Sequence, residues 1–279
     1  MSFDPTVVAL PRALSPSRLQ DFQSCPRKYE YSAVRKLPQP ASYASVKGRF
    51  VHAILERLLG LEPEQRTRDA ANAFIPEAIE VTLTPEVRVD LAYDDALEAT
   101  LLSDTATILD RYFVLEDPTT VVLYEHNEAK ALELPLKADV YGAPLYGILD
   151  RLDRDDEGNL IIVDYKTGSL PRGDYASSAF ANAALYVALC EAELGVTPTS
   201  VRLLYVAAGE TLERPSSAIF PQERARAAAA AWEDIKTAHA AGNFIPRPSA
   251  SACRFCPADY QALCRAEGVA VVVAAPRRR

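Results

Sequence analysis

The spacing of apolar residues along the chain changes near position 120. Before it, apolar side chains recur every three or four positions, most clearly over residues 48–59, as is typical of amphipathic helices. Ser15 followed by Pro16 predicts the capped start of a shorter helix, which ends at Cys25. We predict that residues 61–120 form an acidic helical insertion that caps the core.

Beyond position 120 the pattern predicts strands. Short apolar runs at residues 121–124 and 132–134 precede two longer strands, at residues 145–154 and 160–166, which a polar turn joins. The remaining elements are expected at residues 179–194 (a helix ended by Gly195), 200–207 (a strand) and 224–240 (a helix). This order predicts an α/β fold with a central mixed sheet flanked by helices.

Composition narrows the class of protein. The chain has 279 residues, 49% apolar and 24% charged, which is ordinary for a globular chain with a sizeable core. No run approaches the ~18 apolar residues of a membrane span, and residues 1–10 lack the pattern of a secretory leader. We therefore expect a cytoplasmic protein with no membrane partner, with one domain over residues 1–270 and a tail at 271–279.

The net charge of −8 is the sum of basic regions at the two ends and acidic regions in the middle of the chain. Residues 1–60 carry a net charge of +5 and residues 181–279 carry +2. Residues 61–120 carry −10 and residues 121–180 carry −5. If the two basic ends meet in space, they form one basic surface in an otherwise acidic protein.

The strongest chemical signal lies in the predicted hairpin. If its turn is centred at Glu157, antiparallel pairing places Asp150 opposite Asp164. Side chains alternate along a strand, so Asp164 and Lys166 share one face and Tyr165 points to the other. Two carboxylates and one ammonium group therefore converge on one spot.

The facing carboxylates of Asp150 and Asp164 would be costly without a counter-charge. Opposed side chains on neighbouring strands lie ~5 Å apart. At an effective dielectric constant of about 20, the repulsion is roughly 3 kcal/mol. Either the pair shares a proton or a cation such as Mg²⁺ or Mn²⁺ lies between the two groups. The alternative is an exposed ion pair between Asp164 and Lys166, with Asp150 in a loop.

The run Gly-x-x-Asp150, followed after the hairpin by Asp164-Tyr-Lys166, resembles the PD-(D/E)XK nuclease superfamily. Asp-Tyr-Lys-Thr-Gly is similar to the RecB-like exonuclease branch in particular. The resemblance spans residues 12–60 and 120–265 and implies a restriction-endonuclease-like core that hydrolyses phosphodiester bonds. It implies Asp150, Asp164 and Lys166 as catalytic residues. The implied metal ligands are His52, Asp150, Asp164 and the carbonyl of Tyr165.

Other positions resemble the same branch less strongly. The helix that carries His52 and Glu56 is similar to its helix motif, and the two side chains share one face. Glu125 is similar to an acidic position before the sheet. On the following helix Tyr186 is present, but Asn182 stands where the branch carries glutamine. We expect these residues to support the site or contact the substrate.

Four of the five cysteines form a pattern: Cys25, Cys253, Cys256 and Cys264. The three late cysteines, within residues 246–265, need a fourth ligand that Cys25 can supply, so the residues alone indicate Zn²⁺ held by four thiolates. The layout is similar to that of RecB-like relatives, the AddB nuclease domain and CRISPR-associated exonucleases, which implies a 4Fe–4S cluster. The long last spacer leaves Zn²⁺ as the alternative. We interpret Cys190 as a buried small apolar residue.

A cysteine site that joins the two ends has two consequences. Loop-closure entropy makes such a link worth roughly 5 kcal/mol. It would also bring the basic ends together, so we expect Arg27, Lys28 and the tyrosines between the basic residues to follow a DNA strand. The alternative is that Tyr29 and Tyr31 only pack.

We therefore expect a Mg²⁺- or Mn²⁺-dependent DNA exonuclease of repair, recombination or processing. The rival hypotheses are a catalytically silent module that binds DNA or scaffolds a helicase, and a hydrolase of another phosphoester. The chain has no Gly-x4-Gly-Lys-Ser/Thr motif, so DNA unwinding would need a separate helicase partner.

Overall fold

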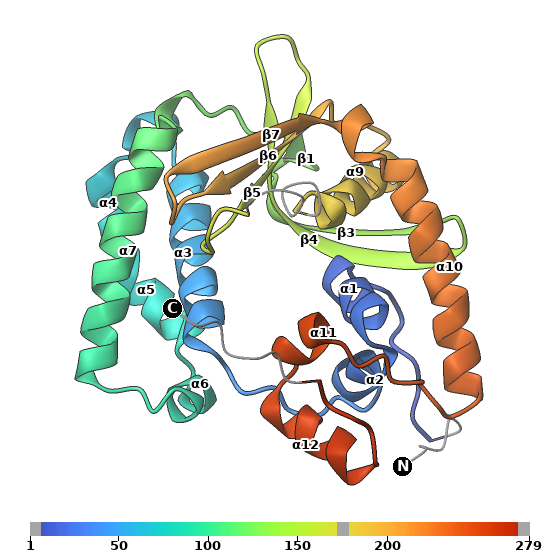
Figure 1. Cartoon of the computed structure of the whole chain (residues 1–279). Coiled ribbons are helices and arrows are strands. Elements are labelled where there is room, and N and C mark those ends of the chain that lie inside the picture. The colour runs from blue at the N-terminus through green and yellow to red at the C-terminus, as the bar shows by residue number, and fades with distance from the viewer. Residues whose placement is uncertain (1–6, 172–178, 273–279) are drawn as a thin grey trace. The chain divides into compact units, whose positions relative to one another are not determined.

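The computed structural model describes residues 7–171 and 179–272 (Figure 1). These residues divide into two compact units, each built from separate stretches of the chain. Unit 1 comprises Met1–Pro40, Ala138–Tyr146 and Glu223–Arg279, and unit 2 comprises Ala41–Lys137 and Gly147–Gln222. The expected single domain over residues 1–270 stays a prediction, and most of the predicted tail lies outside the described residues.

Unit 1 is assembled from both ends of the chain. Its helices are α1 (Pro16–Ser24), α2 (Pro26–Tyr29), the π-helical turn η1 (Glu30–Val34), most of α10 (Pro221–Ala240), α11 (Ala250–Arg254) and α12 (Ala258–Ala266). The Ser15 hydroxyl caps α1 by accepting from the Arg18 N–H, as predicted. Phe22 and Tyr29 pack against Phe244, so the two chain ends share one apolar core.

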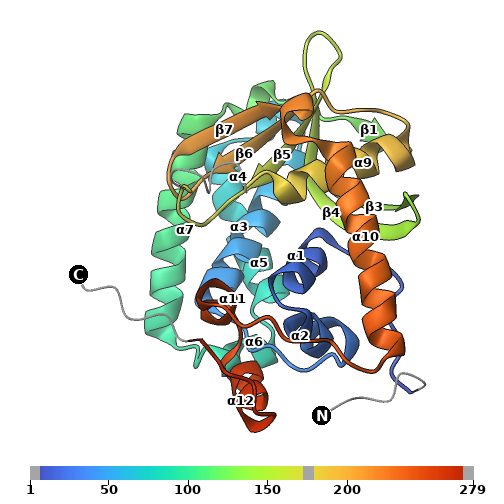
Figure 2. The same ribbon diagram turned by 45° about the vertical axis from the view of Figure 1, so that its right-hand side comes forward.

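Unit 2 carries the acidic helices. They are α3 (Tyr43–Gly60), η2 (Pro63–Gln65), α4 (Arg68–Ala73), α5 (Ile75–Thr82), α6 (Pro85–Asp90), α7 (Asp95–Leu115) and η3 (Pro118–Thr120). α3 and α7 run side by side (Figures 1 and 2). Leu55 of α3 and Leu109 of α7 share one buried cluster with Val163 and Leu204 of the sheet. The helices of residues 61–120 therefore complete the core of unit 2.

The sheet has five strands in the order β3-β4-β5-β6-β7 (Figure 1). The strands are β3 (Leu132–Val140), β4 (Ala143–Arg154), β5 (Leu160–Tyr165), β6 (Ser200–Tyr205) and β7 (Glu210–Pro215), and α9 (Ala181–Leu194) lies between β5 and β6 in the chain. β5 pairs antiparallel with β4 and parallel with β6, so the sheet is mixed. The predicted α/β class with a mixed sheet flanked by helices is confirmed.

Several boundaries differ from the prediction. Residues 121–124 form no regular strand, because only Leu123 bridges to Asp153, and a small hairpin of β1 (Glu125–His126) and β2 (Ala129–Lys130) follows instead. β7 was not predicted. Residues 246–265, which carry the three late cysteines, contain α11 and most of α12. Ser249 caps α11 by accepting from the Ala252 N–H. No helix among the described residues is long and apolar enough to cross a membrane.

Candidate metal centre and cysteine site

The β4–β5 hairpin brings together the two carboxylates that the sequence predicts. Arg151 pairs with Val163, and the next position in this register places Asp150 opposite Asp164. The Asp150 carboxylate accepts a hydrogen bond from the Tyr165 N–H at 2.9 Å. The predicted register is therefore confirmed, and the backbone of β5 holds one carboxylate in place.

His52 reaches the same spot from α3. Its Nε2 lies 3.0 Å from the carbonyl oxygen of Tyr165. A carbonyl oxygen only accepts, so Nε2 carries a proton and donates it. The other ring nitrogen, Nδ1, lies 3.5 Å from Asp150 Oδ2 and 3.8 Å from Glu133 Oε1. The carbonyl thus fixes the ring so that Nδ1 faces the carboxylates, an arrangement common around metal-binding histidines.

Glu133 is a member of the site that sequence reasoning missed. It lies near the start of β3 with φ +44°, a backbone conformation that side chains other than glycine rarely adopt. Such strain is concentrated at functional sites. Ligand atoms of His52, Glu133 and Asp150 all lie within 4.8 Å of one another. These three residues, on α3, β3 and β4, are a group that could hold a metal ion.

The electrostatics of this group fit a divalent cation. Burial and then the charge of Asp164 raise the pKa of Asp150 to about 7. Burial alone would lower the pKa of His52, but the neighbouring carboxylates outweigh it and raise that pKa to about 9. Without a metal ion, protons retained on Asp150 and His52 therefore offset the negative charge of the group. Carboxylate oxygens with one imidazole nitrogen suit Mg²⁺, and Mn²⁺ better.

Lys166 lies beside this group, as predicted. Its ammonium group is 2.6 Å from Asp164 Oδ2. Burial alone would lower the pKa of Lys166, but Asp164 outweighs it and raises this pKa, so the ammonium stays charged. The Tyr165 side chain points the other way, into the core of unit 2, as the alternation along β5 predicts. The alternative of an isolated ion pair with Asp150 in a loop is wrong, because Asp150 lies within β4.

The residues predicted to support the site differ in how they lie relative to it. Glu56 lines an open cleft together with His52 and Glu133. The phenol of Tyr186 lies close enough to the site that burial and then the charges of nearby carboxylates, Asp150 first, raise its pKa. Asn182 lies one helical turn before it on α9, half-buried.

Glu125 does not join the site. It is exposed and pairs across the β1–β2 hairpin with Lys130. No described contact links Glu125 to His52 or Asp150. The prediction for Glu125 is therefore corrected: the additional carboxylate at the site is that of Glu133, eight positions later in the chain.

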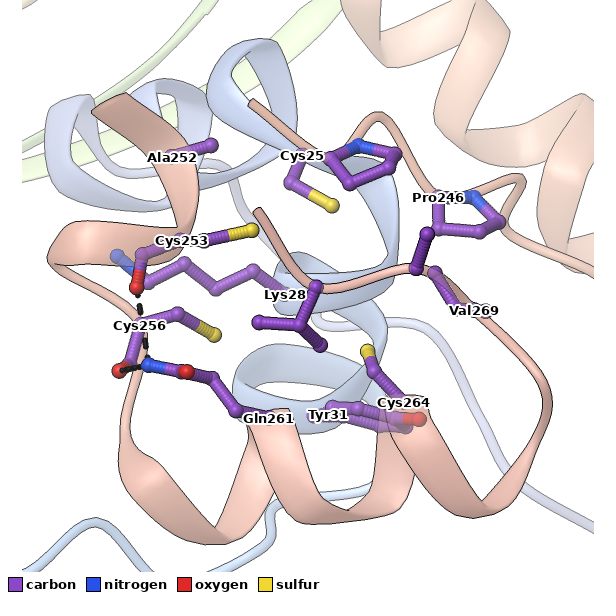
Figure 3. Close-up of a pocket in the computed structure, with 13 residues that line it drawn as sticks. Cys25, Lys28, Tyr31, Pro246, Ala252, Cys253, Cys256, Gln261, Cys264 and Val269 are labelled. Atoms are coloured by element: carbon purple, nitrogen blue, oxygen red, sulfur yellow. Dashed lines mark hydrogen bonds between the residues drawn. The ribbon is translucent and has the colours of Figure 1, made fainter. Parts of the chain in front are cut away.

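The four patterned cysteines line one pocket of unit 1 (Figure 3). Cys25 comes from the junction of α1 and α2, Cys253 from α11, Cys256 from the following turn and Cys264 from α12. All are free thiols in the structure. Burial raises the pKa of the Cys256 thiol to about 11. Thiolates here would need the positive charge of a bound metal, so the pocket is chemically suited to one.

Among the described residues, no three cysteine sulfurs lie within 4.8 Å of one another. A tetrahedral Zn²⁺ ion with Zn–S bonds of about 2.3 Å would bring its four sulfurs to about 3.8 Å. Cys190 lies apart from the pocket, buried in α9 of unit 2, as interpreted from the sequence.

The predicted basic DNA-binding residues are largely neutralised within unit 1. Arg27 is only 7% exposed and pairs with Glu30 and Glu267, each at 3.2 Å. Its predicted phosphate contact is therefore wrong, and Arg27 is an internal ion-pair partner. Lys28 is half-buried, 2.7 Å from Asp21, and lines the cysteine pocket, so its contact with DNA stays a prediction. Tyr29 and Tyr31 are fully buried, as the packing alternative required.

The family model of the PD-(D/E)XK nuclease superfamily matches residues 13–265. The chain therefore belongs to the PD-(D/E)XK nuclease superfamily. The match runs through residues 61–120, which we had placed outside the resemblance. The five-strand mixed sheet flanked by helices is consistent with the restriction-endonuclease-like fold of that superfamily. No curated protein matches the chain.

Proposed function

We propose that the chain is a Mg²⁺- or Mn²⁺-dependent deoxyribonuclease of the RecB-like branch, acting as an exonuclease in DNA repair, recombination or processing. The observation that carries the proposal is the grouping of His52, Glu133 and Asp150 beside the Asp164–Lys166 pair. Membership of the nuclease superfamily supports it. A separate helicase subunit as partner stays a prediction.

The residues of the site have different roles in the proposed reaction. A divalent cation held by His52, Glu133 and Asp150 would supply a Lewis acid for the phosphoryl oxygen and a lower pKa for a water molecule. Lys166 presents a permanently charged ammonium group that stabilises negative charge developing on the phosphate and can orient the attacking water. Asp164 holds that ammonium in position at 2.6 Å.

The test uses end-labelled linear DNA and covalently closed circles, single- and double-stranded, with Mg²⁺, Mn²⁺ or EDTA. We expect cleavage of linear DNA only, and only with metal. Asp164→Ala should lower the rate about 100-fold or more, because it removes the carboxylate that holds the charge-stabilising Lys166 ammonium in position. The matched control is Glu125→Ala, which removes an exposed carboxylate outside the site and should leave the rate unchanged.

The rival function is a silent module that binds DNA or scaffolds a helicase. Wild-type protein that binds DNA but leaves every substrate intact with either metal would favour it. Cleavage of circular DNA would refute the exonuclease mode alone. Equal activity of wild type and Asp164→Ala would refute the assignment of the site.

We further propose that the cysteine pocket holds a 4Fe–4S cluster. Each thiolate of such a cluster binds a different iron atom, so the sulfurs lie farther apart than around one Zn²⁺ ion. The four cysteines that line one pocket support a metal site there, and the resemblance to the RecB-like branch favours the cluster over zinc. Protein purified without oxygen should contain four iron and four sulfide per chain and absorb near 400 nm.

The control for this measurement is Cys190→Ala, which removes a cysteine outside the pocket and should keep the iron. Stoichiometric zinc in a colourless protein would show that the pocket is a zinc site. Neither metal in freshly purified protein would mean that the cysteines are unligated.

A further inference from the structure

A buried charge network lies on the face of the β4–β5 hairpin opposite to Asp150 and Asp164. The Arg151 side chain is fully buried and forms two parallel hydrogen bonds to Glu116, at 2.6 and 2.7 Å. It also donates to Asp153 at 2.8 Å and to the Tyr165 hydroxyl at 2.7 Å. One guanidinium group thus ties together two carboxylates and a phenol inside the core of unit 2.

The stability of the fold does not account for this network. Removing a guanidinium and two carboxylates from water is expensive, and apolar residues of similar volume often give a protein of equal or greater stability. The geometry of the network is nevertheless specific, because Arg151 meets Glu116 in the bidentate arrangement that fixes both groups in one plane. The network therefore suggests a positional role.

Tyr165 connects the network to the metal centre. Its side chain accepts from Arg151 on one face of the sheet. Its N–H donates to the Asp150 carboxylate at 2.9 Å, and its carbonyl accepts from His52 Nε2 at 3.0 Å. The same residue therefore holds two of the three members of the metal group through its backbone.

We propose that Arg151 and Tyr165 are positioning residues for the metal centre. Arg151 fixes the Tyr165 side chain, and this fixes the backbone N–H and carbonyl that aim Asp150 and His52 at the metal. The inference rests on the metal site of the proposed function. It adds that the metal affinity of this site depends on the hydrogen bond from Arg151 to the Tyr165 hydroxyl, in which no metal ligand takes part.

The test measures Mn²⁺ binding by the full chain, by calorimetry and by electron paramagnetic resonance. Tyr165→Phe removes only the phenol oxygen and keeps the ring. We expect it to weaken Mn²⁺ binding about tenfold, the lower end of the effect of groups that orient metal ligands. The melting temperature of each variant is measured alongside, so that loss of fold is recognised.

The matched control is Tyr112→Phe. Tyr112 is equally buried, and its ring centroid lies 6.2 Å from that of Tyr165, a member of the same network. No described backbone contact joins Tyr112 to His52 or Asp150. Its loss should therefore change Mn²⁺ affinity less than twofold.

A second variant, Arg151→Lys, keeps the charge but loses the bidentate geometry, and it should weaken Mn²⁺ binding in the same direction as Tyr165→Phe. Unchanged affinity in folded Tyr165→Phe would overturn the inference and leave the proposed function intact. Equal losses in Tyr165→Phe and Tyr112→Phe would also overturn it, because they would reflect general loosening of the core. Wild type that binds no Mn²⁺ would refute the metal site and, with it, the inference.

Discussion

Gly147, three positions before Asp150, offers a quantitative test of the packing around the site. It lies under the ring of Tyr186 on α9. A Cβ added at this position would lie 2.5 Å from Tyr186 Cε1, 3.1 Å from Cζ and 3.2 Å from the phenol oxygen. The glycine of the Gly-x-x-Asp run is therefore required by its neighbour on α9.

The cost of Gly147→Ala follows from these distances. Carbon atoms in contact prefer separations of about 3.5–4.0 Å, so the ring of Tyr186 has to move by about 1 Å. It cannot do so freely, because its neighbours on α9, Leu185 and Val187, are buried in the core. Overpacking of a well-packed interior costs about 1–3 kcal/mol, and we expect a loss of about 2 kcal/mol in the free energy of unfolding.

Urea-induced unfolding measures this loss, and Gly60→Ala is its control. Gly60, the last residue of α3, has no heavy atom within 4 Å of an added Cβ. Alanine there should leave stability unchanged or raise it by up to about 1 kcal/mol. Combining Gly147→Ala with Tyr186→Ala should remove the clash, so the double variant should be more stable than the two single losses predict. Additive losses, or equal effects at the two glycines, would refute the reasoning.

Three further predictions concern other parts of the chain. Cys25→Ser should abolish iron binding and lower the free energy of unfolding of the loaded protein by about 5 kcal/mol, measured by denaturation without oxygen. Although burial would raise it, Arg151 holds the pKa of Glu116 below its ordinary value of 4.5. The stability that charged Glu116 contributes is present above that value and lost as the pH falls below it, so the difference in unfolding free energy between wild type and Glu116→Gln should shrink in acid. Glu133→Gln should weaken Mn²⁺ binding about tenfold or more, as calorimetry can detect, and Glu125→Gln should not.

The pairing of Asp150 with Asp164 could be predicted because local residues set it. The Asp155 carboxylate accepts from the N–H groups of Glu157 and Asn159, which fixes the turn and with it the register of the strands on either side. Once that register is known, alternation along β5 places Asp164 and Tyr165 on opposite faces. Only residues within one hairpin are involved, so periodicity and turn chemistry are sufficient.

Glu133 could not be found in this way. It reaches the site because β3 pairs with β4 and because its backbone adopts φ +44°. Neither property can be predicted from the surrounding sequence. The predicted strand at residues 132–134 had the right place but gave no reason to choose this carboxylate over Glu125. Its strained conformation is the signal that identifies it, and only coordinates reveal that signal.

The net charge of each region did not predict which basic side chains are paired, because tertiary contacts decide this as well. The sum over residues 1–60 is basic, but charge sums ignore the ion pairs that tertiary structure makes. Arg27 meets Glu267, which lies at the other end of the chain, and Lys47 meets Asp104 at 2.8 Å. Each pair offsets the charge of a basic side chain with that of a carboxylate. The sequence shows how many charges exist but not which of them remain available.

The discontinuous cysteine pocket sets an order of events during biosynthesis. Cys25 is translated early, whereas Cys264 follows only after all of unit 2, which ends at Gln222, has been made. At about 5–20 residues per second, the first thiol waits about 12–48 s for the last one. A metal that needs all four thiolates, as proposed for this pocket, can therefore bind only after the whole of unit 2 has been translated. If the pocket holds that metal, its incorporation distinguishes chains translated through Cys264 from those that stopped earlier.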